Sequence, residues 1–272
     1  MLKNLAKARF FIAKNKKVWY LNNRDLIFRR VKVKTLKYFV SAILGGMAIA
    51  LGSAASLVLS SESKIASAFV FSFGFLAAAI LELGIFTDKP SMLFQKGHID
   101  RHLARVIVLL LGNIIGAVII GAASITMFNS IAKDIIEPKL IASPVSILVG
   151  SVLCGILIHI GMHGYHKAGA GFTGCAVLIL ATSVISVCEF DCCLQNIFYI
   201  VCAFDRYKLY INNAAPAIFL TLGAALGNII GALIFAAFYK IKNMEKQDRS
   251  HGRHRSHKSH HHSRSEDSQK QA

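Results

Sequence analysis

Long apolar runs separated by short polar segments dominate the pattern along this chain. A run of about 18 or more apolar residues is long enough to cross a bilayer core of roughly 30 Å as a helix. Six regions meet this length, and they predict an all-α membrane protein with six transmembrane helices. The regions are Tyr38–Ser60, Ile65–Phe86, Leu103–Phe128, Val145–Met162, Gly171–Phe204 and Ala214–Tyr239.

Composition supports this class, and the distribution of charge predicts an orientation. Apolar residues make up 54% of the chain and charged residues 17%, with a mean hydropathy of +0.53. Of the 31 Lys and Arg residues, 26 fall on one side of the six-span topology and five on the other. Cytoplasmic loops carry the basic excess. We therefore expect both termini in the cytoplasm. The net charge of +17 then reflects orientation in the membrane, and no nucleic-acid partner is expected. The expected location is the plasma membrane.

Three segments follow from this topology. Residues 1–37 form a basic cytoplasmic segment without the apolar stretch of a signal peptide, residues 38–240 the six-span transporter domain, and residues 241–272 a disordered tail rich in His, Ser and Arg. The tail histidines could hold a metal loosely, but a solvated tail beside anionic lipid is the simpler interpretation. All six cysteines fall inside predicted spans, which argues against an extracellular disulfide framework.

An internal repeat divides the six spans into two halves. The heptapeptide Leu111–Ala117 recurs unchanged 115 positions later as Leu226–Ala232. Three spans per half place the second copy upside down in the membrane, which is the inverted repeat of many transporters. The two glycines of each copy allow close helix packing. A packing motif does not explain Asn113 and Asn228, whose amides need partners at membrane depth.

Polar residues interrupt the second and fifth regions. The fifth region has 34 residues, and Glu189 and Asp191 lie in its middle. A central acidic residue costs about 2.5–3.5 kcal/mol on insertion scales, so a broken helix around a central site is expected. The repeat predicts a matching break within Glu82–Pro90, although this segment alone also suits a cytoplasmic helix end.

With these residues in view, the chain resembles the formate/nitrite transporter family over about residues 35–240. The resemblance rests on six features: small residues within Phe39–Leu59, the tripeptide Ile85-Phe86-Thr87, Gly-Asn in the third and sixth spans, Leu153-Cys154, Phe190-Asp191 and Asn196. It implies a homopentamer of aquaporin-like hourglass protomers in the lipid bilayer, each with its own pore and with broken second and fifth helices.

The resemblance also implies roles for individual residues. Thr87 matches the loop threonine that faces the pore centre, Phe86 a neighbouring constriction residue, and Lys139 a lysine near the outer vestibule. Phe198 is expected at a second apolar constriction. The expected substrate pathway comprises Thr87, Phe86, Lys139, Asp191, Cys192, Asn196, Phe198, Asn113 and Asn228.

This chain departs from the family pattern at the pore centre. Cys192 stands where the family has a histidine, and Gly155 where it has an asparagine. Gly84 and Asp88-Lys89 replace the residues that flank the loop threonine. A thiol cannot hold a positive charge, so we expect a weaker central proton relay and a larger share of the polar contact for Thr87. Cys192 as a mere filler is the alternative.

The expected function is channel-like transport of a small monovalent anion or its acid, together with a proton. Formate is the first candidate, with acetate, lactate, nitrite and hydrosulfide as others. Passage of water, glycerol or ammonia is one alternative, although the Asn-Pro-Ala loops of aquaporins are absent. A non-conducting membrane scaffold with basic tails is another.

An enzyme is not expected, nor is a cofactor or a bound metal. His159, His163 and His166 have spacings that suit a metal, but no acidic or cysteine partner accompanies them in the sequence. The simpler interpretation is a helix end that reaches the polar interface.

Overall fold

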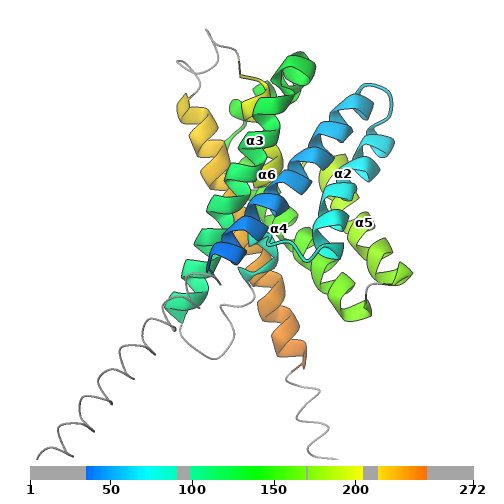
Figure 1. Ribbon diagram of the computed structural model, residues 1–272, viewed down its shortest axis with the longest axis vertical. Coiled ribbons are helices and arrows are strands. Elements are labelled where there is room, and N and C mark those ends of the chain that lie inside the picture. Colours follow the sequence, from blue (N-terminus) through cyan, green and yellow to red (C-terminus); the bar gives the residue numbers. More distant parts are fainter. Residues whose placement is uncertain (1–34, 91–98, 170, 205–213, 244–272) are drawn as a thin grey trace, which may run out of the picture.

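The structure is a computed structural model that describes residues 35–90, 99–169, 171–204 and 214–243, and this part of the chain is helical without β-strands (Figure 1). Two helices that carry no label in Figure 1 are called the Thr35 helix and the Ala214 helix, after their first residues. In chain order the elements are the Thr35 helix (Thr35–Ser60), α2 (Lys64–Ile80), the 3₁₀ turn η1 (Phe86–Asp88), α3 (Ile99–Leu140), α4 (Pro144–Ala168), α5 (Phe172–Val187), α6 (Cys193–Cys202) and the Ala214 helix (Ala214–Asn243).

Four of these helices are long and apolar enough to cross a membrane: the Thr35 helix, α3, α4 and the Ala214 helix. They correspond to the first, third, fourth and sixth apolar regions of the sequence. α3 has 42 residues and extends beyond the predicted span at both ends, so Lys139 lies in its last turn. At 1.5 Å per residue such a helix is about 63 Å long, about twice the bilayer core.

The second and fifth apolar regions are not continuous helices. α2 has 17 residues and ends at Ile80, and the chain then runs through a non-helical segment into η1. α5 has 16 residues, and α6 begins only at Cys193 and has 10. Both interruptions lie where the sequence predicts a break. Ile85, Phe86 and Thr87 are at most 2% exposed, so the first break is folded into the protein rather than a free helix end.

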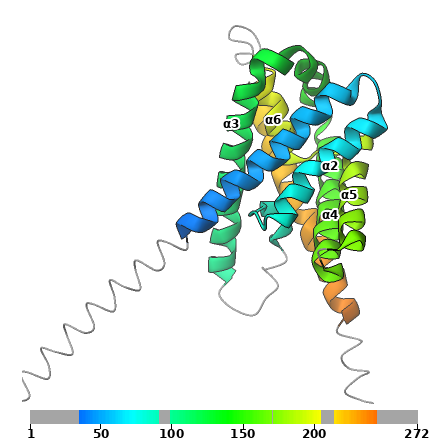
Figure 2. The same cartoon turned by 45° about the vertical axis from the view of Figure 1, so that its right-hand side comes forward.

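The repeated glycines bring helices into close contact, as the sequence predicts. A Cβ atom on Gly116 would lie 2.1 Å from the backbone oxygen of Ile43 in the Thr35 helix. In the second copy, a Cβ atom on Gly231 would lie 2.0 Å from the backbone oxygen of Val152 in α4. Both distances are far below van der Waals contact, so only glycine fits. α5 contacts both α2 and α4, and α6 contacts α3 (Figure 2).

Two glycines of the Ala214 helix give a matched test of this packing. We expect Gly231→Ala to destabilise the protein by about 1–3 kcal/mol, because the added methyl group overlaps α4. Gly223→Ala is the control, since its Cβ would meet only Ile147 Cγ2 at 3.5 Å. Alanine raises helix propensity by about 1 kcal/mol at either position. Thermal unfolding in detergent measures both, and equal midpoints for the two variants would contradict the argument.

The long helices give the molecule two ends that are easy to distinguish. The Thr35 helix begins and the Ala214 helix ends toward the same, lower end in Figures 1 and 2. The turn between the Thr35 helix and α2, and the junction of α3 with α4, lie at the opposite end. A cavity can therefore be assigned to one end or the other by the helix ends that line it.

Candidate substrate pathway

Asn113, in the middle of α3, holds the first break in place. Its Oδ1 accepts a hydrogen bond of 2.9 Å from the Phe86 backbone N–H. Its Nδ2 donates to the backbone oxygens of Ala42, at 2.6 Å, and Gly84, at 2.7 Å. Asn113 is fully buried. The amide therefore supplies the backbone of the broken segment with partners that an uninterrupted helix would have provided.

Asn228, in the Ala214 helix, makes the corresponding bonds at the second break. Its Oδ1 accepts from the Cys193 N–H at 3.0 Å, and its Nδ2 donates to the backbone oxygens of Ser151, at 2.8 Å, and Asp191, at 3.0 Å. Asn228 is also fully buried. The two asparagines of the repeated heptapeptide thus form equivalent hydrogen bonds to the backbone at the two helix breaks. The sequence predicted that these amides need partners, but it did not identify the backbone of the breaks as the partner.

The two breaks share one turn. At the end of α2 and again at the end of α5, a glutamate adopts the left-handed region, with φ of 53° at Glu82 and 57° at Glu189. The residue after each glutamate donates a backbone hydrogen bond five positions back: Leu83 to Ala78 at 2.8 Å and Phe190 to Ile185 at 3.0 Å. Every member of one turn lies 107 positions from its counterpart in the other. The repeat therefore extends from the helices to the breaks.

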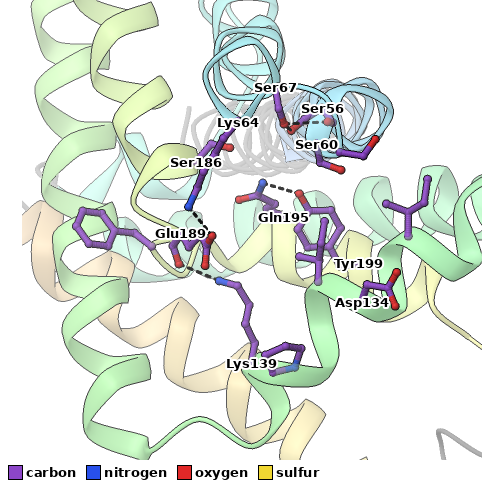
Figure 3. Close-up of a pocket in the computed structure, with 15 residues that line it drawn as sticks. Ser56, Ser60, Lys64, Ser67, Asp134, Lys139, Ser186, Glu189, Gln195 and Tyr199 are labelled. Carbon is purple, nitrogen blue, oxygen red and sulfur yellow. Dashed lines mark hydrogen bonds and ion pairs between the residues drawn. The ribbon is translucent and has the colours of Figure 1, made fainter.

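A cavity of about 480 Å³, which we call the Lys139 cavity, opens beside the second break (Figure 3). Its lining is largely polar and comes from the last turns of the Thr35 helix, the start of α2, the end of α3 and the second break. It therefore lies at the end of the molecule opposite Thr35. Its polar lining residues are Ser56, Ser60, Ser61, Lys64, Ser67, Asp134, Lys139, Ser186, Glu189, Gln195 and Tyr199.

Lys139 reaches from α3 toward the second break and is held there by an ion pair. Its Nζ lies 2.7 Å from Asp191 Oδ1 and donates to the Glu189 backbone oxygen at 3.0 Å. Asn196 Nδ2 donates to the same Asp191 oxygen at 3.2 Å. The Lys139 and Asp191 side chains are only 18% and 11% exposed. Three predicted pathway residues thus form one cluster, in which Asp191 neutralises the charge of Lys139.

A second cavity of about 460 Å³, which we call the Asp88 cavity, lies at the other end of the molecule. It is lined by the first residues of the Thr35 helix, the first break and the last turns of α4. Within it Asp88 is 8% exposed and forms an ion pair with Lys89. His166 Nε2 lies 3.9 Å from Asp88 Oδ2. The charged and titratable lining residues are Lys37, Tyr38, Glu82, Asp88, Lys89 and His166.

Between the two cavities, the residues of the breaks are closely packed. Phe86 and Phe198 are fully buried, Thr87 is 2% exposed and Cys192 is 1% exposed. Thr87 Oγ1 is buried and has no hydrogen-bond partner among the residues that the structure describes. A buried hydroxyl without a partner is costly, and it is therefore suited to bind a polar solute that enters the centre.

Cys192 occupies the N-cap position of α6, where it takes an extended backbone conformation. The thiol of Cys154 from α4 lies close to it. Both cysteines are buried, and all six cysteines are free. Two weakly polar thiols therefore lie together here, and the sequence did not indicate that Cys154 would lie beside Cys192.

The α4 histidines do not form the simple helix end that the sequence suggested. His159 is 4% exposed, and its ring stacks on that of His163, with ring centroids 5.9 Å apart and planes 11° apart. The prediction that these histidines mark a helix end at the polar interface is therefore wrong for His159. Across the described ranges, no group of three or more His, Cys, Asp or Glu residues is arranged to hold a metal. The tail histidines lie outside the described residues.

Two features of the site were not predicted from the sequence. Lys64 Nζ lies 2.7 Å from Glu189 Oε1 across the Lys139 cavity (Figure 3), at side-chain exposures of 59% and 68%. Gln195 Nε2 donates to the Tyr199 hydroxyl at 2.8 Å, one turn along α6. A polar pair at i and i+4 in an apolar helix could have indicated the second feature. No sequence signal indicates the first, because its residues are 125 positions apart.

Cavities at both ends of a helical membrane protein, separated by packed helix breaks, define a channel or transporter. The formate/nitrite transporter family profile matches residues 22–241, and the chain belongs to this family. The family is one of membrane transporters for small anions, so the protein is an integral membrane transport protein and not an enzyme. No curated protein matches.

Solved structures show the same fold. A pentameric formate channel with formate bound is 20% identical over 78% of this chain and 98% of the channel chain, with a TM-score of 0.67. An ion channel of the same family is 15% identical over 79% of this chain and 93% of the other, with a TM-score of 0.71.

Proposed function

We propose that the protein carries small monovalent anions, or their acids, through each protomer together with a proton. Formate is the first candidate, and acetate, lactate, nitrite and hydrosulfide have similar size and charge. The observation that carries this proposal is the pair of cavities at opposite ends, with Phe86, Thr87 and Cys192 buried between them. The pathway would then lie within one chain rather than between copies.

The protomer in this proposal has six spans in two inverted halves, with both termini in the cytoplasm. Support comes from the turns 107 positions apart and the asparagines 115 positions apart, which make the same hydrogen bonds. In this orientation the Asp88 cavity opens to the cytoplasm and the Lys139 cavity to the outside. The basic excess on the side of Lys37 fits the positive-inside rule.

The charges of the Lys139 cavity favour entry of an anion but not its passage as a bare ion. Lys64 and Lys139 supply positive charge at the mouth, but both are paired with carboxylates. An unpaired anion in an apolar, water-excluded constriction carries a large desolvation cost. We therefore propose that the anion collects near Lys139, takes up a proton from water in the cavity and crosses as the neutral acid. Thr87 Oγ1 provides a hydrogen-bond partner at the centre.

We also propose a homopentamer in a lipid bilayer, most simply the plasma membrane. One solved structure with this fold is a pentameric formate channel. Large apolar side chains on the outside of the protomer support this assembly, because contact with lipid or with neighbouring copies would cover them. Examples on α3 are Leu103, Ile107, Leu111 and Met127, which are 47–71% exposed.

Uptake into proteoliposomes tests the proposed function. Radiolabelled formate is expected to enter faster at acidic than at neutral external pH, because the neutral acid is then more abundant. We expect Thr87→Ala to reduce uptake about tenfold, the equivalent of one hydrogen bond of roughly 1.4 kcal/mol. Thr87→Ser should retain uptake because it keeps the hydroxyl. Equal uptake by empty and protein-containing liposomes for all five acids would overturn the proposal.

One observation favours a second candidate, the passage of uncharged solutes such as water, glycerol or ammonia. Asp191 neutralises Lys139, so the pathway has no unpaired fixed cation at this position. Osmotic swelling of the same liposomes separates the two candidates. Swelling in glycerol without any uptake of formate would favour the uncharged solute.

A further inference from the structure

Three histidines of α4 lie along the inner half of the pathway. His159, His163 and His166 are spaced four and three residues apart, which places them on one face of the helix. α4 packs on η1, the short turn that contains Thr87 and Asp88. The imidazole rings therefore follow α4 from the Asp88 cavity toward the first break. We name His159, His163 and His166 together the histidine row.

The member of the row nearest the cavity meets a buried carboxylate. His166 Nε2 lies 3.9 Å from Asp88 Oδ2, and both residues line the Asp88 cavity. The His166 side chain is 50% exposed, whereas that of Asp88 is 8% exposed. A proton on His166 can therefore exchange with water in the cavity, while Asp88 stabilises the imidazolium from the buried side.

The two deeper members of the row have unused hydrogen-bonding capacity. His159 Nδ1 and His163 Nε2 are buried and have no partner among the described residues. Phe235 and Tyr239 of the Ala214 helix cover the row on its other side, with Tyr239 in edge contact with His163 at 4.6 Å between centroids. Buried imidazoles with unused nitrogens are suited to accept and release protons.

Other charged and polar groups face Asp88 from each packed element that the structure describes. Lys89 and Glu82 come from the first break, and Lys37 and Tyr38 from the Thr35 helix. Lys167, at the end of α4, is bonded instead to the Tyr239 hydroxyl at 2.7 Å. α3 also packs on η1, but there it presents the uncharged Asn113 and Leu109. Among the described groups around Asp88, histidine is the residue type that ordinarily changes charge between about pH 5 and 8.

We propose that Asp88 and the histidine row form the proton-exchange site of this transporter, on the cytoplasmic side of the Thr87 constriction. This inference rests on the proposed function. An entering acid transfers its proton to the His166 imidazole and leaves as the anion, and the imidazolium then releases that proton to water in the Asp88 cavity. His163 and His159, nearer the centre, offer nitrogens unpartnered within the described ranges as hydrogen-bond acceptors to a solute. The central thiol of Cys192 cannot take this role, because it has no cationic form.

The test varies internal pH while external pH stays fixed. In proteoliposomes with an external pH of about 5.5, formate uptake by the unmodified protein should fall about threefold to tenfold as internal pH drops from about 7.5 to 5.5, because the imidazoles become protonated. We expect His166→Gln to remove most of this dependence on internal pH. The dependence on external pH should remain, because it reflects the abundance of the neutral acid.

Further variants distinguish proton exchange from a structural role. Asp88→Asn should weaken the dependence on internal pH, because His166 loses the carboxylate that faces it in the cavity, and Asp88→Glu should restore the dependence. His163→Gln and His159→Gln should each weaken the dependence less than His166→Gln. Asp100→Asn, at an exposed position in the first turn of α3, is the control and should leave the profile unchanged.

Each outcome has a clear meaning. If the unmodified protein takes up none of the five acids, the proposed function fails. If it takes up formate and His166→Gln shows the same fall with internal pH as the unmodified protein, the proposed function stands and the proton-exchange site is overturned. An Asp88→Asn protein that does not fold leaves the decision to His166→Gln, whose side chain is half exposed. Elution of this variant from a sizing column at the volume of the unmodified protein checks that it is folded.

Discussion

Asn228→Ala is expected to cause one of the two largest losses of stability among single substitutions at the breaks. The substitution leaves the Cys193 N–H and the backbone oxygens of Ser151 and Asp191 without their buried partner. Each unsatisfied buried group costs about 1–3 kcal/mol, so the total approaches the whole stability of a typical domain. The expected result is protein that unfolds or aggregates on extraction from the membrane, measured by thermal unfolding in detergent.

The repeat supplies a second variant and a matched control for this prediction. Asn113→Ala removes the three equivalent bonds at the first break and should cause a loss of similar size. Asn129→Ala is the control, because Asn129 donates two bonds of 3.1 Å to the backbone oxygens of Cys202 and Phe204 in a partly buried position. A loss from Asn228→Ala no greater than that from Asn129→Ala would contradict the role given to the repeat.

The second large effect is expected from the ion pair between Lys139 and Asp191. Asp191→Asn leaves the Lys139 ammonium 18% exposed and without its carboxylate partner, and breaking a pair this buried costs about 3–5 kcal/mol. We also expect formate uptake to fall at least tenfold, because an unpaired cation beside the pathway retains the anion. Lys139→Met should lower the stability of the protein by a similar amount, because it leaves the Asp191 carboxylate without its partner.

The double variant decides whether the pair itself is responsible. Lys139→Met combined with Asp191→Asn removes both charges, so its loss of stability should be well below the sum of the single losses. Unfolding midpoints of the four proteins give this coupling directly. Lys64→Met with Glu189→Gln is the control cycle, since this pair is more than half exposed and should couple by under about 1 kcal/mol. Additive losses in the first cycle would show that the ion pair is not what stabilises the site.

The sequence predicted the positions of the breaks and of the two asparagines because each has a local signature. Carboxylates in the middle of an apolar run are costly, and an identical heptapeptide 115 residues away is visible without any structure. The partners of the asparagines are not local. Asn228 bonds to Ser151, 77 positions earlier, and nothing in either neighbourhood specifies that pairing.

The prediction for Lys139 was incomplete for a related reason. The family resemblance suggested the outer vestibule, and Lys139 does line a cavity, but its pairing with Asp191 spans 52 positions. The apolar pattern also predicted too early an end for the third helix, at Phe128. α3 continues through polar residues as far as Leu140. A lysine expected in a loop is therefore held in the last turn of a helix.

For His159 the sequence supported the wrong environment. Three histidines near the end of an apolar run are usual at a polar interface, and this interpretation needs no partner. The structure instead buries His159 against His163 and Phe235, because the Ala214 helix covers this face of α4. Which face of a helix is covered depends on how the two halves assemble, and periodicity within α4 does not contain that information.

The left-handed glutamates at the two breaks bear on the order in which the chain assembles. A residue other than glycine in the left-handed backbone region costs about 1–2 kcal/mol. Glu82 and Glu189 both adopt this backbone conformation. Neither turn is therefore favoured while its helix is alone in the bilayer. The compensating bonds come from Asn113 and Asn228, which enter the membrane later in synthesis than the turns they hold. We therefore expect each break to close only when the helix that carries its asparagine packs against it, which would make the pathway a late product of folding.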